Sequence, residues 1–307
     1  MISREEFQKF ANSLITEEDK TEIKSRRILF LVLGLIFMTL TLIFVILTFI
    51  SGINGLYYLG FSIIFLTVSL IFLCGGKGFA YSRVLNKYKP LIIEFLLKKY
   101  KYAYNAKGYL GKDLYAQFNL PMYYDTYSGE DYIALNIPKD DGTQSTTDLQ
   151  ISQIKTSQHY KDKDGNIKER TIYSGTLGIV TFDFHFPCYL ALGKNYFGWQ
   201  VKEEKMETED TEFNKNFKTY TDNELEAFRI LTPDLMLKMI DIHRKLKYID
   251  FVFKENKLLI YMPNKDLFAI KGHKDGYEKS FELIYNDIEA LIEIIKEIQT
   301  NNKVFKF

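Results

Sequence analysis

Cysteine, proline and tryptophan are scarce in this chain of 307 residues, and its charges almost cancel. The only cysteines are Cys74, in an apolar run, and Cys188, in a distant segment. This usage excludes the disulfide framework that holds small secreted domains together. The formal net charge is +1, so no overall attraction favours nucleic acid. We therefore expect no nucleic-acid partner.

Asp, Glu, Lys, Arg and His are missing altogether from Ile28 to Gly76. A bilayer core ~30 Å thick needs about 20 apolar residues of helix, so this run is long enough for two passes. Glycine and asparagine within Ser51-Gly52-Ile53-Asn54-Gly55 favour a turn in its middle. The sequence thus predicts a transmembrane hairpin over 28–76, with helices at about 28–50 and 57–75.

Two other interpretations of this run are weaker. A cleaved signal peptide needs only ~7–15 apolar residues, and its basic first region would not contain the acidic residues found here at Glu17, Glu18, Asp19 and Glu22. A buried hairpin of a soluble protein would rarely lack every charged group over such a length. The spans hold no ionisable group for an ion or proton pathway, so we expect an anchor.

Basic residues flank the hairpin on both sides, whereas the turn carries no charge. Lys24, Arg26 and Arg27 precede it, and the residues that follow it are Lys77, Arg83, Lys87 and Lys89. The positive-inside rule then predicts a multi-pass protein with both termini in the cytoplasm.

A basic segment follows the second helix. Residues 77–107 contain eight basic residues and one acidic residue, Glu94, with apolar residues at helical spacing between them. This pattern predicts a juxtamembrane helix over 77–110 that lies against anionic lipids of the inner leaflet. The expected headgroup contacts are Lys77, Arg83, Lys87 and Lys89. The contact either recognises a specific lipid or only orients the protein, as basic flanks commonly do. Before the hairpin, Ser3 and Glu6 form a capping box that predicts an amphipathic cytoplasmic helix within 1–27.

The remaining chain, residues 111–307, is predicted to be a cytoplasmic α+β domain with a mainly antiparallel sheet and flanking helices, because strands and helices come in blocks. Alternating apolar residues predict strands at 132–137, 151–160, 167–173, 177–186, 196–202, 249–253 and 258–262. Capping residues and helical periodicity predict helices that begin near Thr221 or Asp222 and at Thr232-Pro233, and a last helix at about 280–299.

Motifs that carry chemistry are missing from the sequence. There is no phosphate-binding glycine loop, zinc-protease motif or nucleophile elbow. Asp162, Asp164 and Asn166 imitate the start of a calcium loop, but Ile167 and Tyr173 replace its required Gly and Glu.

Asp183, His185 and Cys188 form the only tight group of potential metal ligands, and no second Cys/His pair completes a tetrahedral site. Alternation with phenylalanines favours an amphipathic strand with its polar residues outward. We predict no catalytic residue, metal or cofactor, and the sequence leans against an enzyme.

A set of short motifs resembles a known family. Glu212-Phe213-Asn214-Lys215-Asn216-Phe217 is followed by Tyr220-Thr221-Asp222 and by Glu226-Ala227-Phe228-Arg229-Ile230-Leu231-Thr232-Pro233. Two more motifs precede these, at Ile172 to Leu177 and Phe182-Asp183-Phe184. Two others follow them, at Ile249 to Phe253 and Leu267-Phe268. In this order they resemble the bacterial membrane family called domain of unknown function 3137, over about residues 125–270. The resemblance implies a bacterial inner-membrane protein with a cytoplasmic α+β domain and no established activity or site residues.

The sequence therefore favours a membrane-anchored binding or scaffold module whose protein partner is unknown. Two alternatives stay open. One is an enzyme that acts at the membrane surface with a site assembled from scattered residues. The other is a subunit of a larger membrane complex.

Overall fold

Two compact units make up the chain in the computed structural model. The helical unit comprises Ser3–Ile92 and Ile270–Leu283, and the sheet unit comprises Met1–Ile2, Ile93–Ala269 and Ile284–Phe307. The structure describes residues 1–51, 55–118, 120, 123–139, 146–193, 203–270 and 277–300. The middle of the predicted turn at 52–54 and the strand predicted at 196–202 lie outside these residues, as do the side chains of Lys77 and Arg83.

Three helices begin the helical unit. Helix α1 (Arg4–Leu14) is capped as predicted, since the Ser3 side chain accepts a hydrogen bond from the Glu6 N–H at 3.2 Å. Helices α2 (Glu17–Ile50) and α3 (Gly55–Leu85) form the hairpin. Helix α2 begins well before residue 28, because Thr16 and Asp19 form a full capping box that starts the helix in the charged segment.

Small residues line the contact between α2 and α3. On α2 the buried ones are Gly34 and Thr41; on α3 they recur at intervals of seven residues, at Gly55, Ser62, Ser69 and Gly76. The Ser69 hydroxyl donates to the Gly34 carbonyl oxygen across the contact at 2.9 Å. A Cβ atom added at Gly34 would lie 2.6 Å from a Leu73 methyl. A seven-residue repeat keeps such residues on one seam, where they let the two backbones approach closely.

Aromatic rings pack beside this seam, also at intervals of seven residues. The rings of Phe37 and Phe72 are stacked with centroids 5.7 Å apart, and those of Phe44 and Phe65 are 5.2 Å apart. Such pairs contribute about 0.5–1.5 kcal/mol each beyond their buried area. Small and aromatic residues together therefore hold α2 and α3 to each other.

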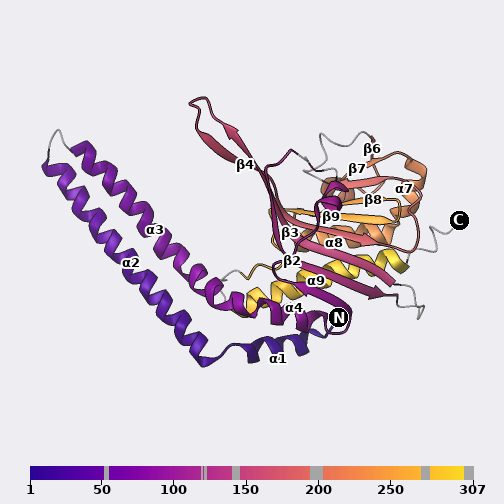
Figure 1. Ribbon diagram of the computed structural model, residues 1–307, viewed down its shortest axis with the longest axis horizontal. Coiled ribbons are helices and arrows are strands. Elements are labelled where there is room, and N and C mark those ends of the chain that lie inside the picture. The colour runs from indigo at the N-terminus through magenta and orange to yellow at the C-terminus, as the bar shows by residue number, and fades with distance from the viewer. Residues whose placement is uncertain are drawn as a thin grey trace. The chain divides into compact units, whose positions relative to one another are not determined.

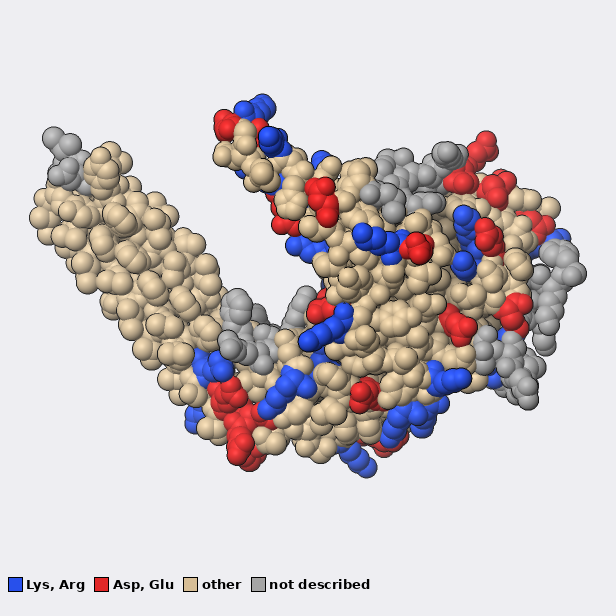
Figure 2. Space-filling view, viewed as in Figure 1, with Lys and Arg blue, Asp and Glu red and all other residues tan. Residues whose placement is uncertain are grey.

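The other faces of α2 and α3 are apolar and uncovered. Only 11% of the apolar window of α2 is buried, and 17% of that of α3, although both are long and apolar enough to cross a membrane. Figure 2 shows this surface free of Lys, Arg, Asp and Glu, with charged side chains only at the base of the hairpin. The core helix of a soluble protein would be mostly buried, so the exposure favours a membrane protein.

The segment after α3 differs from the single basic helix predicted over 77–110. Helix α3 ends at Leu85, a 3-10 turn η2 (Asn86–Tyr88) follows, and α4 (Lys89–Leu97) begins a new helix. Pro90 fits the first turn of α4 but has no N–H for the interior of a continuous helix. Strand β1 (Lys101–Asn105), which the sequence reading missed, comes next.

The sheet unit is built on one nine-stranded sheet, and every neighbouring pair is antiparallel, which confirms the predicted α+β class. Its order is β1-β2-β3-β4-β9-β8-β5-β7-β6. The remaining strands are β2 (Thr126–Pro138), β3 (Thr146–Lys161), β4 (Ile167–Thr181), β5 (Leu190–Gly193), β6 (Glu204–Met206), β7 (Lys218–Thr221), β8 (Asp250–Lys254) and β9 (Lys257–Pro263).

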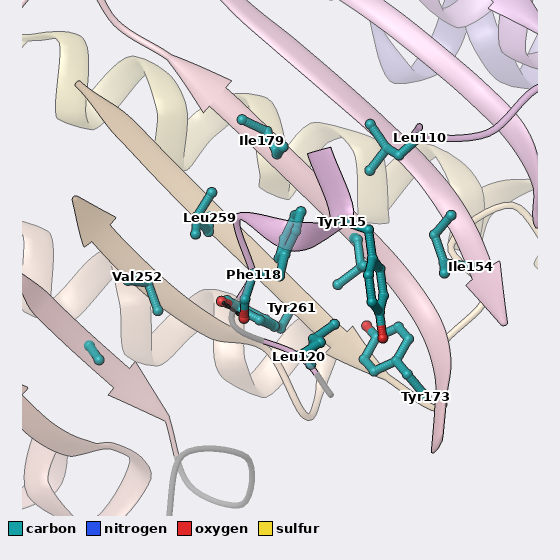
Figure 3. Close-up of a cluster of buried hydrophobic side chains, with 12 residues drawn as sticks. Leu110, Tyr115, Phe118, Leu120, Ile154, Tyr173, Ile179, Val252, Leu259 and Tyr261 are labelled. Carbon is teal, nitrogen blue, oxygen red and sulfur yellow. Dashed lines mark hydrogen bonds between the residues drawn. The ribbon is translucent and has the colours of Figure 1, made fainter. Parts of the chain in front are cut away.

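Both faces of the sheet are covered. One face carries the segment with α5 (Lys112–Ala116), and Figure 3 shows Tyr115 and Phe118 over the sheet residues Tyr173 and Tyr261. The Tyr261 hydroxyl donates to the Phe118 carbonyl oxygen at 2.8 Å. The opposite face carries α8 (Pro233–Leu246) and α9 (Tyr277–Thr300) (Figure 1). An ion pair of 3.1 Å between Lys238 and Glu293 joins these two helices. Cover on both faces explains why β8 and β9 are almost continuously apolar.

Several helix and strand ends differ from the predictions; strand β2, for example, begins at Thr126 and not at residue 132. The strand predicted at 177–186 ends at Thr181 and is continuous with the one predicted at 167–173. Helix α7 (Glu224–Ile230) is capped by Asn223 and not by Thr221 or Asp222, since the Asn223 side chain accepts from the Glu226 N–H. Strands β5, β6 and β7 and helix α6 (Thr211–Asn216) are short and were not predicted as elements.

Replacement of Gly34 by isoleucine should separate α2 from α3, because its Cβ would collide with Leu73. Overpacking of this kind costs about 1–3 kcal/mol. With cysteines at Thr41 and Ser62 and with Cys74→Ser, oxidation should form the cross-helix disulfide several-fold more slowly in Gly34→Ile. Gly60→Ile is the control, since a Cβ at Gly60 meets nothing within 4 Å. Equal disulfide rates in the two variants would contradict the close seam.

Candidate functional site

Strands β3 and β4 continue beyond the sheet as a two-stranded arm, residues 158–171 (Figure 1). Strand β2 pairs with β3 only as far as Ser157, and β9 pairs with β4 only from Gly175 onward. The two strands pair with each other up to Lys161 and Ile167. None of the arm residues is buried. The arm therefore adds ordered backbone to the domain without adding to its core.

Polar contacts hold the arm in shape. The Asp162 Oδ1 atom accepts hydrogen bonds from the N–H groups of Asp164 and Asn166 at 3.0 and 2.9 Å, and Gly165 has a φ of 82°. The Lys168 ammonium lies 2.8 Å from the Asp162 carboxylate and, with these bonds, lowers its pKa. The segment predicted as a hairpin turn is one, and no group of three metal ligands occurs among the described residues.

Exposed apolar side chains stand on the arm among the charges. Tyr160 is 45% exposed and Ile167 is 71% exposed. Apolar side chains that stay exposed to water add nothing to the stability of the fold. Charged side chains of both signs surround them at the tip (Figure 2). The arm is therefore a hydrogen-bonded ribbon whose charged and apolar side chains are exposed.

The cluster of Asp183, His185 and Cys188 does not form a metal site. Asp183 and His185 point outward, and the Lys139 ammonium lies 2.8 Å from the Asp183 carboxylate. Cys188 is buried, and burial raises the pKa of its thiol to about 11. The segment is not a strand as predicted, because the Phe182 and Phe186 N–H groups donate to carbonyls of the β8–β9 turn.

The other histidines and the hollows of the sheet unit offer little chemistry. The His243 ring packs 5.1 Å from the Phe217 ring, and His159 lies 3.5 Å from the Asp125 carboxylate on the surface. His273 lies outside the described residues. One hollow of about 350 Å³ lies beside α5, and its lining is Ala116, Gln117, Lys254, Glu255, Lys257 and Leu259. It holds neither a histidine nor a pair of carboxylates for proton transfer.

A buried carboxylate joins the two ends of the hairpin. Asp19 lies in the charged first turns of α2, before the apolar segment begins, and is 2% exposed. Its carboxylate accepts hydrogen bonds from the Lys87 ammonium and the Tyr88 hydroxyl in η2. The Thr16 N–H donates to it as well, at 3.1 Å. We call this group the clasp.

The clasp favours the charged form of Asp19. Burial alone would raise the pKa of Asp19, but the hydrogen bonds from Lys87, Tyr88 and Thr16 outweigh burial and hold this pKa well below its usual value. Lys87 is half-exposed, so solvent screens its part of the attraction. Sequence reasoning missed the clasp, although Thr16-Glu17-Glu18-Asp19 has the spacing of a capping box.

The clasp changes what is expected of the four basic residues assigned to lipid. The Lys87 ammonium is already paired with Asp19, and Lys89 also has an interaction within the chain. The side chains of Lys77 and Arg83 lie outside the described part of the structure. Headgroup contact by these four residues stays a prediction.

The features that carry the family resemblance are local packing and capping devices. The rings of Phe213, inside α6, and Phe217, which caps its C-terminal end, lie 5.1 Å apart. The Thr232 side chain caps α8, and the Arg229 guanidinium pairs with Glu226 at 3.0 Å within α7. Residues 171–300 match the family described as protein of unknown function DUF3137. This region is a DUF3137 domain.

The DUF3137 match begins later and ends later than the 125–270 expected from sequence. It runs from the base of the arm in β4 to the end of α9, and it leaves out the hairpin and β1 to β3. The chain has no match among curated proteins and none among solved structures. The match therefore relates residues 171–300 to the DUF3137 family but does not indicate an activity.

Replacement of Asp19 by asparagine should weaken the clasp, because it removes the charge that Lys87 and Tyr88 contact. Hydrogen bonds to charged groups contribute about 1–3 kcal/mol, so the variant should unfold at a lower temperature in detergent at pH 7. Because the pKa of Asp19 is lower in the folded state, its ionised form stabilises the fold at pH values above the ordinary pKa of 3.8. This stabilisation is lost as the pH falls below 3.8. The difference from the unmodified protein should therefore shrink below about pH 4.

The exposed neighbour Glu18, changed to glutamine, is the matched control for the removal of one negative charge. It should leave the melting temperature almost unchanged. A difference between the Asp19→Asn variant and the unmodified protein that stays constant with pH would rule out the ionised clasp.

Proposed function

We propose that this chain is a multi-pass protein of the bacterial inner membrane that holds a cytoplasmic binding or scaffold domain at the membrane surface. Helices α2 and α3 are the anchor, both termini are cytoplasmic, and the sheet unit presents the arm to a protein partner. Basic residues after the apolar run that ends at Gly76, with Lys77, Arg83, Lys87 and Lys89 among them, contact anionic lipids.

The membrane part of the proposal rests on the uncovered apolar faces of α2 and α3. Its orientation rests on the basic residues at both ends of the hairpin. The inner membrane comes from the family resemblance alone. These features fit an anchor better than a pathway, since no Asp, Glu, Lys, Arg or His occurs from Ile28 to Gly76.

The binding part rests on one observation, the exposed arm. Ordering the backbone of a residue costs about 1–2 kcal/mol, and the arm residues offset none of this by burial within the domain. A ribbon that is ordered and yet exposes Tyr160 and Ile167 fits a surface that becomes buried against a partner. No comparable arrangement of acids, bases and a hollow favours the enzyme alternative among the described residues.

Removal of the arm should leave the domain folded. In the test variant Asn-Gly replaces residues 158–170 and joins Ser157 to Thr171, which face each other across the two strands. Because no arm residue is buried, we expect a melting temperature within about 3 °C of the full chain. A drop of more than about 10 °C would show that the arm is part of the core.

Partner contact is measured by photo-crosslinking in the native membrane. A crosslinking amino acid at Tyr160 or Ile167 should give a discrete higher-mass adduct. The control position is Leu237, which is 60% exposed on α8 of the same domain and should give none. Adducts at Leu237 and not on the arm would move the binding surface to the helices, and no adduct at either arm position would contradict the proposal.

A further inference from the structure

Most lysines with a described ion pair lie next to a carboxylate on a neighbouring element or turn. Lys139, Lys168 and Lys265, for example, lie 2.7–2.8 Å from Asp183, Asp162 and Asp287. The lysines around β1 differ. Lys99, Lys101 and Lys107 are exposed and have no ion pair within the described residues.

Strand β1 is an edge of the nine-stranded sheet, since among the described strands it pairs only with β2. Four of its five residues are exposed, so neither face of this strand is well covered. Lys98 lies before it with its ammonium 3.9 Å from the centre of the Phe95 ring. Tyr102 in the strand and Tyr109 after it are 36% and 42% exposed. We call Lys98, Lys99, Lys101, Tyr102, Lys107 and Tyr109 the β1 edge.

Acidic residues are few around this edge. None occurs in the sequence from Phe95 to Lys112. The carboxylates that act on Tyr104, in the middle of β1, are Asp131 and Glu130 of β2 and Glu94 of α4. Of these, Asp131 is buried and bonded to the Tyr104 hydroxyl at 2.8 Å. Glu94 and Glu130 are exposed, but the four lysines of the edge outnumber them, so the outward charge of the edge is positive.

We propose that the β1 edge is a docking surface for the headgroups of anionic phospholipids. Exposed lysines supply the attraction to phosphate, and tyrosine rings suit the boundary between headgroups and acyl chains. The lysines assigned from sequence are less suited, since Lys87 is held in the clasp. The proposal rests on the proposed membrane anchor and names the surface and the lipid class that orient the domain.

Chain connectivity keeps this edge within reach of the bilayer. The apolar window of α3 ends at Gly76, and β1 begins at Lys101. The end of α3, the turn η2 and α4 lie between them and are mostly helical. At about 1.5 Å per helical residue these elements span no more than roughly 40 Å along the chain. A surface tethered so closely meets headgroups at high effective concentration.

The test uses the full chain with Cys74→Ser in lipid nanodiscs. A fluorophore on Ala103→Cys, an exposed position in β1, reports contact with lipids that carry a quencher on the headgroup. In discs with about 30% anionic lipid we expect at least threefold more quenching than in neutral discs, and about 0.5 M salt should remove most of the difference. The same fluorophore on Gly165→Cys at the arm tip should show no dependence on anionic lipid.

Four substitutions to glutamine, at Lys98, Lys99, Lys101 and Lys107, should abolish the dependence. The control carries the same change of net charge on other exposed lysines of the sheet unit, at Lys215, Lys218, Lys247 and Lys254, and should retain it. Equal quenching in neutral and anionic discs, or equal quenching in the two variants, would overturn the proposal. Quenching that depends on two chains per disc would assign the edge to a second copy of the chain instead. Failure of the chain to remain with the discs would contradict the anchor itself, which separates the two proposals.

Discussion

Apolar side chains cover the outward faces of α2 and α3, and this surface is stable only where water is excluded. Burial of apolar surface is the dominant favourable term in folding, and these faces have no protein against them. The inward faces are already used, since small residues and stacked rings join the helices. The hairpin has a packed inner contact and an apolar outer surface, so it is suited to lipid. This location determines where the rest of the chain lies.

The sheet unit carries its own constraint. Because helices cover one face of the sheet and the α5 segment covers the other, the faces of the middle strands are buried within the domain. The arm and the edge strands are what the sheet leaves exposed. The arm combines rigidity with exposed Tyr160 and Ile167, and the β1 edge combines lysines with tyrosines. These two surfaces differ in chemistry, which is why we assign protein to one and lipid to the other.

Much of the fold could be predicted from sequence, because strong periodic patterns carry it. The uncharged run to Gly76, the hairpin turn at Asp162 and the Thr232-Pro233 helix start are local signals, and each is present in the structure. The short strands β5, β6 and β7 were not predicted, because three or four residues are too few to show an alternating pattern. The clasp was not predicted, because its carboxylate and its lysine lie 68 residues apart and form no local sequence pattern. The seam of small residues was visible as a seven-residue spacing, which a search for glycine pairs alone overlooks.

The central claim is that the hairpin crosses a membrane and leaves the sheet unit on the cytoplasmic side. Two-sided labelling of single cysteines measures it most directly, with Cys74→Ser as background and the buried Cys188 left in place. A maleimide that cannot cross membranes should label Ser51→Cys at the hairpin turn in spheroplasts that retain an intact inner membrane. It should label Gly165→Cys on the arm only after the membrane is opened. Labelling of Gly165→Cys in the intact spheroplasts, or release of the chain from membranes by alkaline carbonate, would contradict the claim.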